Sequence, residues 1–213
     1  MWHHSLAYEP ITSQRRRRYV AMMSAMAQLR SATSSSHQRL EKRLDVKSRF
    51  TDLRAYREHL KKMWGFCAAL ESRLAADSFG GALPDYDARR KLPLLTHDLV
   101  ALGESEGGLA SLPRCAAVAR EMDAAAAFGC AYVLEGATLG GRTLLPLVQS
   151  RMGFTSSHGA RYLASYGDNV AAMWRDFGSA LDGWCCVAER RHAAMQAAVA
   201  TFDILGDWLC GAP

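Results

Sequence analysis

The sequence predicts an all-α protein. Alanine, leucine, methionine and arginine are frequent, β-branched residues are sparse, and no alternating polar and apolar pattern typical of a strand stands out. With 213 residues, of which 49% are apolar and 22% charged, the chain is long enough to bury the core of one domain. We expect a helical domain over residues 19–213, preceded by a disordered tail over residues 1–18 that shows no periodicity.

Charge and cysteine content exclude several classes of function. The formal net charge is +5, and most of that excess comes from Arg15 to Arg18. Because the rest lacks a basic stripe with interleaved aromatic residues, no nucleic-acid partner is expected, and no apolar window is long enough for a membrane span. Six cysteines without Cys-x-x-Cys spacing indicate buried, reduced thiols and a cytoplasmic location. The arginine run with the apolar segment after it also resembles an export signal, an alternative disfavoured by the helical pattern that continues beyond it.

The first helix is predicted over Tyr19–Leu44. Its apolar positions recur at spacings of three and four, so they share one face. His37 falls in this series and is expected to face the core. The series consists of Leu29, Thr33, His37, Leu40 and Leu44.

His37 has two possible roles. A histidine on an apolar face is usually a structural residue. Here, however, Ser34–Ser36 leave space beside the ring, and Arg30 lies two helical turns earlier on nearly the same face. A neutral imidazole can ligate a metal, and a guanidinium can hold a carboxylate.

Turn signals divide the rest of the chain into further helices. Thr51 is the expected N-cap of the second helix, and Pro93 is expected to limit or kink the third. Pro113 suits the first turn of a long fourth helix that Pro146 is expected to kink, and Asp168 is the expected cap of the next one. The predicted helices span residues 52–75, 86–102, 113–152 and 168–184, with a last one ending near 209, and loops are predicted at 77–85, 103–112 and 153–157.

A glycine-rich helical stretch, Phe128–Leu145, reads FGCAYVLEGATLGGRTLL. Gly129, Val133, Gly136 and Gly140 fall at spacings of four, three and four and so share one face. Each glycine costs roughly 1 kcal/mol relative to alanine in a helix interior. A compensating gain comes either from close crossing by another helix, the commoner case, or from a flat ligand against the bare backbone.

Two of these stretches, in this order, resemble the haem oxygenases, and specifically their soluble bacterial branch. LRSATSSSHQRLEKRL is similar to the family's proximal helix and YVLEGATLGGRTLL to its distal helix. ARRKLPLLTHDLVALG, between them, resembles another family block, and YLASYGDNVAAMWRDF resembles the later segment typical of the bacterial members. The resemblance implies a single-domain helical fold with haem between the proximal and distal helices. It gives His37 the role of iron ligand, and Gly136, Gly140 and Gly141 the role of letting the distal backbone pass close over the haem.

The resemblance also implies a reaction. Haem b would serve as both substrate and cofactor, and dioxygen with electrons from an external donor would convert it to biliverdin, carbon monoxide and ferrous iron. The implied partners are a ferredoxin or flavoprotein reductant and, where the biliverdin is used as a chromophore, a bilin-binding photoreceptor. Iron release is the other implied purpose.

Several positions depart from the family pattern. Mammalian-type enzymes place an aspartate just after the first distal glycine, where this chain has Ala137, and their basic clamp for the haem propionates falls here at Trp174 and Gly178. Arg30 does match a basic position before the proximal histidine. Tyr132 is expected either to pack in the core, the commoner role, or to hydrogen-bond near the haem, and Phe177 is expected to line the pocket.

Two other classes of protein are alternatives to the oxygenase. A non-catalytic haem-binding or haem-transfer protein would keep His37, and Ala137 leaves that possibility open. A di-iron carboxylate protein would need two Glu-x-x-His motifs, and only Glu189 to His192 has that spacing.

Overall fold

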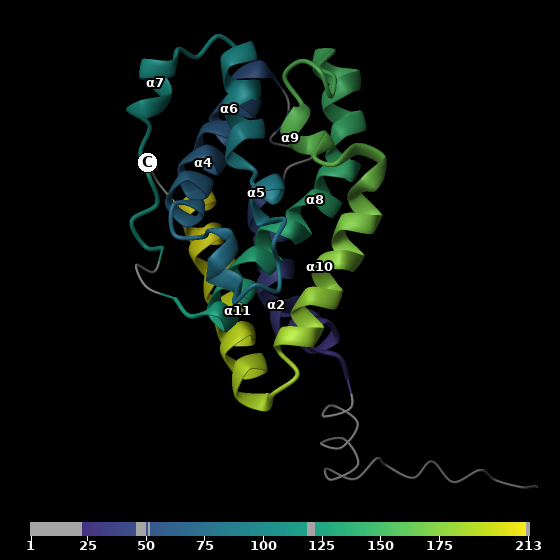
Figure 1. Cartoon of the computed structure of the whole chain (residues 1–213). Helices are drawn as coiled ribbons and strands as arrows, with labels where there is room; N and C mark the ends of the chain where they lie inside the picture. The colour runs from purple at the N-terminus through teal and green to yellow at the C-terminus, as the bar shows by residue number, and fades with distance from the viewer. Residues whose placement is uncertain (1–22, 46–49, 51, 119–121, 212–213) are drawn as a thin grey trace, which may run out of the picture.

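The protein is a bundle of helices (Figure 1). A computed structural model describes residues 23–45, 50, 52–118 and 122–211, and it contains no strand within these ranges. The predicted all-α class is therefore confirmed, while the tail predicted over residues 1–18 lies outside the described ranges. The helices are α2 (Ala25–Leu44), α4 (Leu53–Glu71), η1 (Ala76–Phe79), α5 (Tyr86–Arg89), α6 (Leu92–Ala101), α7 (Glu106–Ala110), α8 (Ala124–Met152), α9 (Arg161–Ala164), η2 (Gly167–Asn169), α10 (Val170–Trp184) and α11 (Ala188–Cys210).

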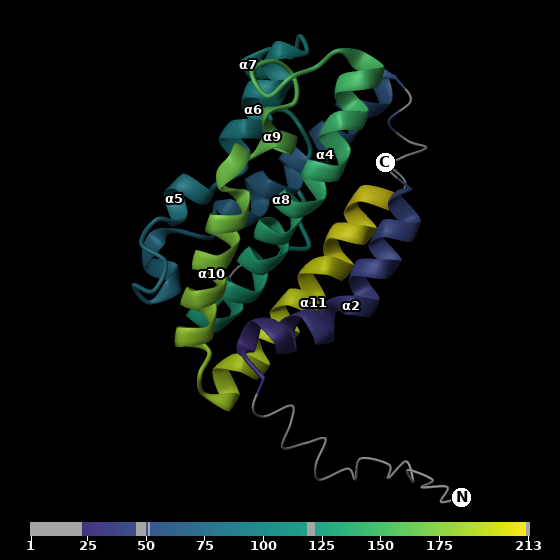
Figure 2. The same ribbon diagram turned by 90° about the vertical axis from the view of Figure 1, so that its right-hand side faces the viewer.

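Helices α8 and α11 organise the bundle. Helix α11 packs against both α8 and α2, and Figure 2 shows α2 and α11 side by side. On its other sides α8 contacts α9 and α10, while α4 packs against α6. The core between these helices is apolar and rich in aromatic rings, and its largest fully buried side chains include Tyr56, Phe66, Phe79, Phe128 and Phe177.

Helices α2 and α4 begin at Ala25 and Leu53, later than the starts predicted at residues 19 and 52. Helix α2 starts directly after Ser24, whose hydroxyl accepts a hydrogen bond of 3.2 Å from the backbone N–H of Ala27. Helix α4 starts after Asp52, whose carboxylate accepts the equivalent bond from Ala55 at 2.9 Å. The cap of α4 is thus Asp52 and not Thr51, which lies outside the described residues. In each case a side-chain oxygen satisfies a free N–H of the first turn.

The third predicted helix is in fact two. Arg90 is extended, with ψ of 136°, and separates α5 from α6. Pro93 therefore lies in the first turn of α6, where its missing N–H costs nothing, and does not kink a longer helix. The loop predicted at 103–112 contains the short helix α7, which is capped by the hydroxyl of Ser105.

Helix α8 begins at Ala124 after the capping carboxylate of Asp123, and so it starts eleven residues later than the predicted start at Pro113. Its end is as predicted, because Gly153 adopts a left-handed conformation with φ of 73° directly after it. Pro146 lies inside the helix. Asp168 is not the cap of α10, since it lies within η2 and α10 follows Asn169.

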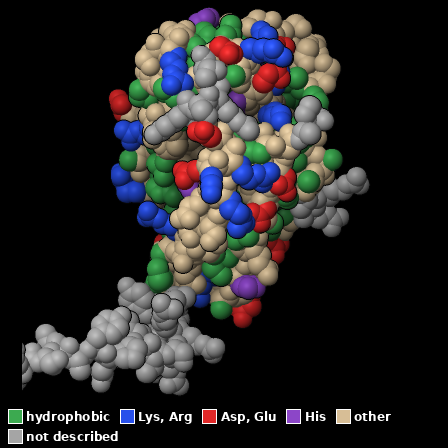
Figure 3. All heavy atoms as spheres, turned by 180° about the vertical axis from the view of Figure 1, so that it is seen from behind, with side chains coloured by type: hydrophobic (Ala, Val, Ile, Leu, Met, Phe, Trp, Pro, Cys, Tyr) green, Lys and Arg blue, Asp and Glu red, His purple; other side chains and the backbone are tan. Residues whose placement is uncertain are grey.

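The surface is mixed in charge. On the face seen in Figure 3, basic and acidic side chains are interspersed with hydrophobic ones. None of the described helices combines the length and the apolar character needed to cross a membrane.

All six cysteines are free. Cys67, Cys115, Cys130 and Cys185 are buried, as predicted for structural thiols, and burial raises the pKa of each. Cys186, in contrast, is exposed.

Candidate functional site

The two helices that carry the predicted site approach each other at Tyr132 of α8. Its hydroxyl lies beside the side chain of Thr33 and near the guanidinium of Arg30, both on α2. Burial raises the pKa of this hydroxyl, and the Thr33 contact and the positive charge of Arg30 act in the opposite direction. The Tyr132 ring also lies 5.6 Å from the ring of Trp174 on α10. Through Tyr132, α8 therefore contacts both α2, the predicted proximal helix, and α10.

Two glycines of α8 have open space where a side chain would be. A Cβ on Gly140 would have no atom within 4 Å outside its own helix, and one on Gly136 would meet only Cη2 of Trp174 at 3.9 Å. Gly140 is exposed and Gly136 is half-buried. These two positions present bare helix backbone at the surface, which is the arrangement that a flat ligand requires.

The other two glycines of α8 serve helix packing. A Cβ on Gly129 would clash with the backbone carbonyl of Ala194 on α11, and one on Gly141 would lie 2.5 Å from the carbonyl oxygen of Leu163 on α9. The expectation that Gly141 borders the ligand is thus corrected, because its Cα faces α9. Both explanations offered for the glycine stretch apply, each to a different pair of residues.

His37 does not face the core. Its side chain is 52% exposed, and Nδ1 lies 3.6 Å from Oε2 of Glu41 one turn later. The ring lies edge-on to Phe202 of α11, with centroids 5.6 Å apart. The prediction was wrong because the buried series of α2 passes through Ser36 and leaves His37 at its edge. The Glu41 contact occupies the Nδ1 side of the ring, so Nε2 is the nitrogen directed away from it.

The other predicted site residues divide into two groups. Arg30 is exposed and Ala137 is half-buried, so both reach the surface of their helices. Phe177 is 0% exposed and lies in the core, 6.0 Å from Phe128, which contradicts the expectation that it lines the site. Trp174 stacks on Phe177 at 6.0 Å and is the aromatic residue that reaches Gly136 instead.

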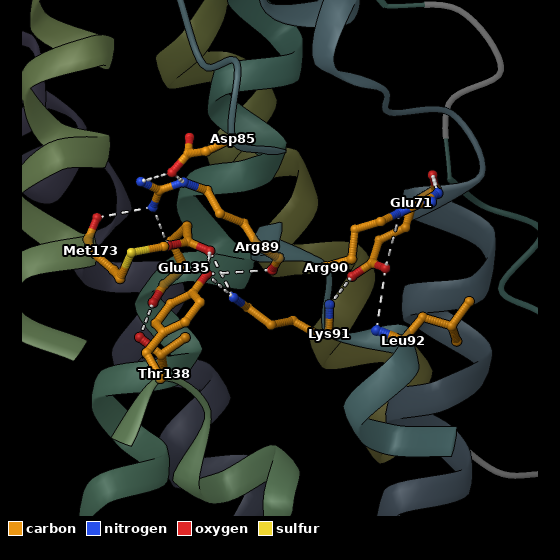
Figure 4. A network of polar contacts seen from close by, with 10 residues as sticks. Glu71, Asp85, Arg89, Arg90, Lys91, Leu92, Glu135, Thr138 and Met173 are labelled. Carbon is orange, nitrogen blue, oxygen red and sulfur yellow. Dashed lines mark hydrogen bonds and ion pairs between the residues drawn. The ribbon is translucent and has the colours of Figure 1, made fainter. Parts of the chain in front are cut away.

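A buried network of charges, which sequence reasoning missed, lies beside the open glycines (Figure 4). Glu135, the residue before Gly136, accepts hydrogen bonds from Lys91 Nζ at 2.7 Å and from the Tyr166 hydroxyl at 2.6 Å. Its other oxygen accepts one from Arg89 at 3.1 Å. One carboxylate of α8 is thereby tied to α5, to the start of α6 and to the segment after α9.

Lys91 connects this carboxylate to a second one. Its backbone N–H and that of Leu92 donate to Glu71, at 2.6 Å and 3.2 Å. Burial lowers the pKa of the Lys91 ammonium, and the attraction of Glu135 opposes that shift. Burial raises the pKa of Glu71, while its backbone hydrogen bonds favour the charged form. A charged residue inside an apolar helix was the available signal in the sequence, but its partners come from distant segments.

An apolar cavity of about 110 Å³ lies elsewhere, between α4, α8 and α11. Its lining includes Phe66, Cys130, Thr201 and Ile204 and none of the predicted site residues.

Comparisons with known proteins show the family and the fold of the chain. The sequence model of the haem oxygenase family matches residues 23–210. A solved structure of the NO- and CO-bound haem oxygenase of Neisseria meningitidis is similar to the chain at a TM-score of 0.74 and 23% identity, covering 88% of this chain and 90% of that one. The haem oxygenase of Leptospira interrogans has a TM-score of 0.74 at 14% identity, covering 89% of this chain and all (100%) of that one. At these identities the two structures show a shared fold. No curated protein sequence matches the chain.

Proposed function

Because this chain belongs to the haem oxygenase family, we propose that it cleaves haem with dioxygen and external electrons to biliverdin, carbon monoxide and ferrous iron. The observation that carries this proposal is the bare backbone at Gly136 and Gly140 on α8, together with an exposed histidine on α2. A haem between two helices needs an iron ligand, often a histidine, on one side and room for a flat macrocycle on the other. His37 would meet the first need, and Gly136 and Gly140 would meet the second.

His37 would hold the haem iron through Nε2. The Glu41 carboxylate, 3.6 Å from Nδ1, would then orient the ring and increase its basicity, as carboxylates behind metal-bound histidines commonly do. Phe202 supports one edge of the ring. These two contacts would favour one orientation of the exposed imidazole ring.

Gly136 and Gly140 would exclude side chains from the face opposite His37. Ala137, between them in sequence, adds only a methyl group at a position where the family resemblance leads us to expect an aspartate in mammalian-type enzymes. Tyr132 would close the narrow end of the site, where α8 approaches Thr33. Arg30, beside that hydroxyl, supplies a cation for one of the carboxylates of haem.

Haem, when bound, supplies the iron and porphyrin chemistry of oxygen activation, and the protein supplies ligation, orientation and control of water. The electrons would come from a ferredoxin or a flavoprotein. The biliverdin would serve iron release or supply a bilin-binding photoreceptor, and the reaction would take place in the cytoplasm.

A second candidate is a haem carrier that binds haem without degrading it. Ala137 favours this alternative, because a methyl group cannot hydrogen-bond a water beside the iron. The two candidates share the binding site and differ in the fate of bound haem.

The test is a hemin titration of the purified protein, followed by ascorbate or a ferredoxin system in air. We compare His37→Ala with His192→Ala, which removes an exposed histidine from α11 as a matched control. The oxygenase proposal expects a one-to-one Soret complex that is lost only in His37→Ala and decays into a biliverdin spectrum. A complex that survives reductant and oxygen supports the carrier, and no complex in the wild type rejects both.

A further inference from the structure

The guanidinium of Arg89 bridges α8 and α10. One nitrogen, Nη1, donates to Glu135 at 3.1 Å and to the backbone carbonyl of Met173 at 2.9 Å. Its remaining nitrogens bond Asp85 at 2.8 Å and 3.0 Å, so its orientation is fixed from a third side. Figure 4 shows Glu135 and Met173 approaching the same guanidinium from two helices.

The guanidinium contacts one residue on each helix, and each of these residues is followed in sequence by a residue at the open face. Glu135 precedes Gly136, and Met173 precedes Trp174. Trp174 is the residue whose ring reaches the Cβ position of Gly136, at 3.9 Å. The bridge therefore sets the spacing of α8 and α10 at the level where the indole lies against the bare backbone.

Among the described residues, no side chain or backbone group makes a hydrogen bond to this indole that would fix its position. Its neighbours are the Tyr132 ring at 5.6 Å and the Phe177 ring at 6.0 Å, both contacts between apolar surfaces. Such contacts tolerate sliding, whereas a guanidinium with three directed hydrogen bonds and an ion pair does not. The position of the indole thus depends on the helix that carries it, and that helix is held by Arg89.

Stability alone does not account for the network. Buried ion pairs are often no more stabilising than apolar side chains of similar volume, because both charges lose their hydration. Glu135, Arg89 and Lys91 are all buried. What a charge network supplies and an apolar contact does not is directional geometry.

We propose that Arg89 and Glu135 are positioning residues that fix the separation of α8 and α10 and so hold Trp174 against Gly136 as one wall of the haem site. The effect on haem binding rests on the proposed function. The placement of Trp174 does not, because it is a property of the ligand-free protein. Neither residue is required to contact haem.

The test compares two buried carboxylates. Glu135→Gln weakens the bridge, whereas Glu71→Gln changes a carboxylate that is equally buried but bonds the backbone at the start of α6. The full-length protein is labelled with 5-fluorotryptophan, and among its five tryptophans Trp174 is assigned with Trp174→Phe. Fluorine NMR then reports the surroundings of this indole without haem, and hemin titration gives the affinity.

We expect Glu135→Gln to move or broaden the Trp174 resonance and to weaken hemin affinity, because the displaced indole no longer forms the wall of the site. Glu71→Gln should leave both near the wild-type values, even where it lowers stability. An unchanged Trp174 resonance in Glu135→Gln, or an equal change in both variants, would overturn the inference.

Arg89→Met is the second variant, in case Glu135→Gln does not fold. Methionine has no hydrogen-bond donor, so Glu135 and the Met173 carbonyl lose their common partner and the same displacement of the Trp174 resonance is expected. Wild-type protein that fails to bind hemin would reject the proposed function, while the fluorine spectra would still decide whether Arg89 and Glu135 place the indole.

Discussion

Replacing Gly140 with alanine should make the protein more stable and less able to bind haem. In a helix interior, alanine is favoured over glycine by about 1 kcal/mol. No atom outside the local helix backbone lies within 4 Å of the new Cβ, so no steric cost offsets this gain. The free energy of unfolding should therefore rise by about 1 kcal/mol, which corresponds to roughly 2–4 °C in Tm for a domain of this size.

Gly129→Ala is the matched control in the same helix. The propensity gain is the same, but the new Cβ would clash with the Ala194 carbonyl and would lie 2.8 Å from the Cβ of Ala197. Because these are backbone and near-backbone atoms of α11, the helices must move apart, and overpacking of this kind costs about 1–3 kcal/mol or more. Urea unfolding followed by circular dichroism measures both variants. A loss of stability in Gly140→Ala, or a gain in Gly129→Ala, would refute the reasoning.

The weaker haem binding expected of Gly140→Ala is measured by hemin titration. If haem lies against Gly140, the added methyl overpacks that contact at about 1–3 kcal/mol, or roughly 5- to 150-fold in Kd. A variant that gains stability and still binds hemin as tightly as the wild type would place the haem away from Gly140.

Three further predictions test the fold. Burial raises the pKa of Cys185 to about 11, so at pH 8 its thiolate fraction should be about 100-fold lower than that of an ordinary cysteine. Iodoacetamide should therefore label the exposed Cys186 far faster than Cys185, and equal labelling by mass spectrometry would contradict this. Ser165 has φ of 47° and a buried hydroxyl without a partner among the described residues, so Ser165→Gly should raise the unfolding free energy in urea by about 1 kcal/mol, and a loss would count against it. Tyr56→Phe removes a buried 2.9 Å hydrogen bond to the Gly159 carbonyl and should lower stability by about 1–3 kcal/mol; an unchanged urea midpoint would argue against that bond.

The helical class and the glycine-rich face of α8 could be predicted because they depend on local sequence. Helical periodicity is visible in the sequence whatever the tertiary packing, and the spacing of the glycines in α8 indicates a helix face without side chains. Which glycine meets a helix and which meets open space depends on α9 and α11, and no local pattern contains that information. Gly141 was misplaced for this reason, although it adjoins Gly140 in sequence.

His37 and Glu135 illustrate the same limit. Ser36 lies within the buried face of α2, whereas His37, the next residue, lies at its edge. Periodicity alone does not distinguish two neighbouring positions of this kind. Glu135 was visible as a charge in an apolar stretch, but its partners Lys91 and Arg89 lie more than forty positions earlier, at separations of 44 and 46. Pairings of this range are set by tertiary packing.

Helix α11 contacts α8 and α2 in different ways. Toward α8 it passes so close that Gly129 has no room for a methyl group, and backbone held at that distance cannot shift without separating the helices. Toward α2 the helices also pack closely, and they are joined at the surface by ion pairs of 2.8 Å and 2.9 Å, from Arg39 and Arg43 to Asp203 and Asp207. Exposed pairs of this kind contribute little and weaken in salt. Loss of either ion pair should therefore be tolerated, whereas a single methyl group added at Gly129 should not.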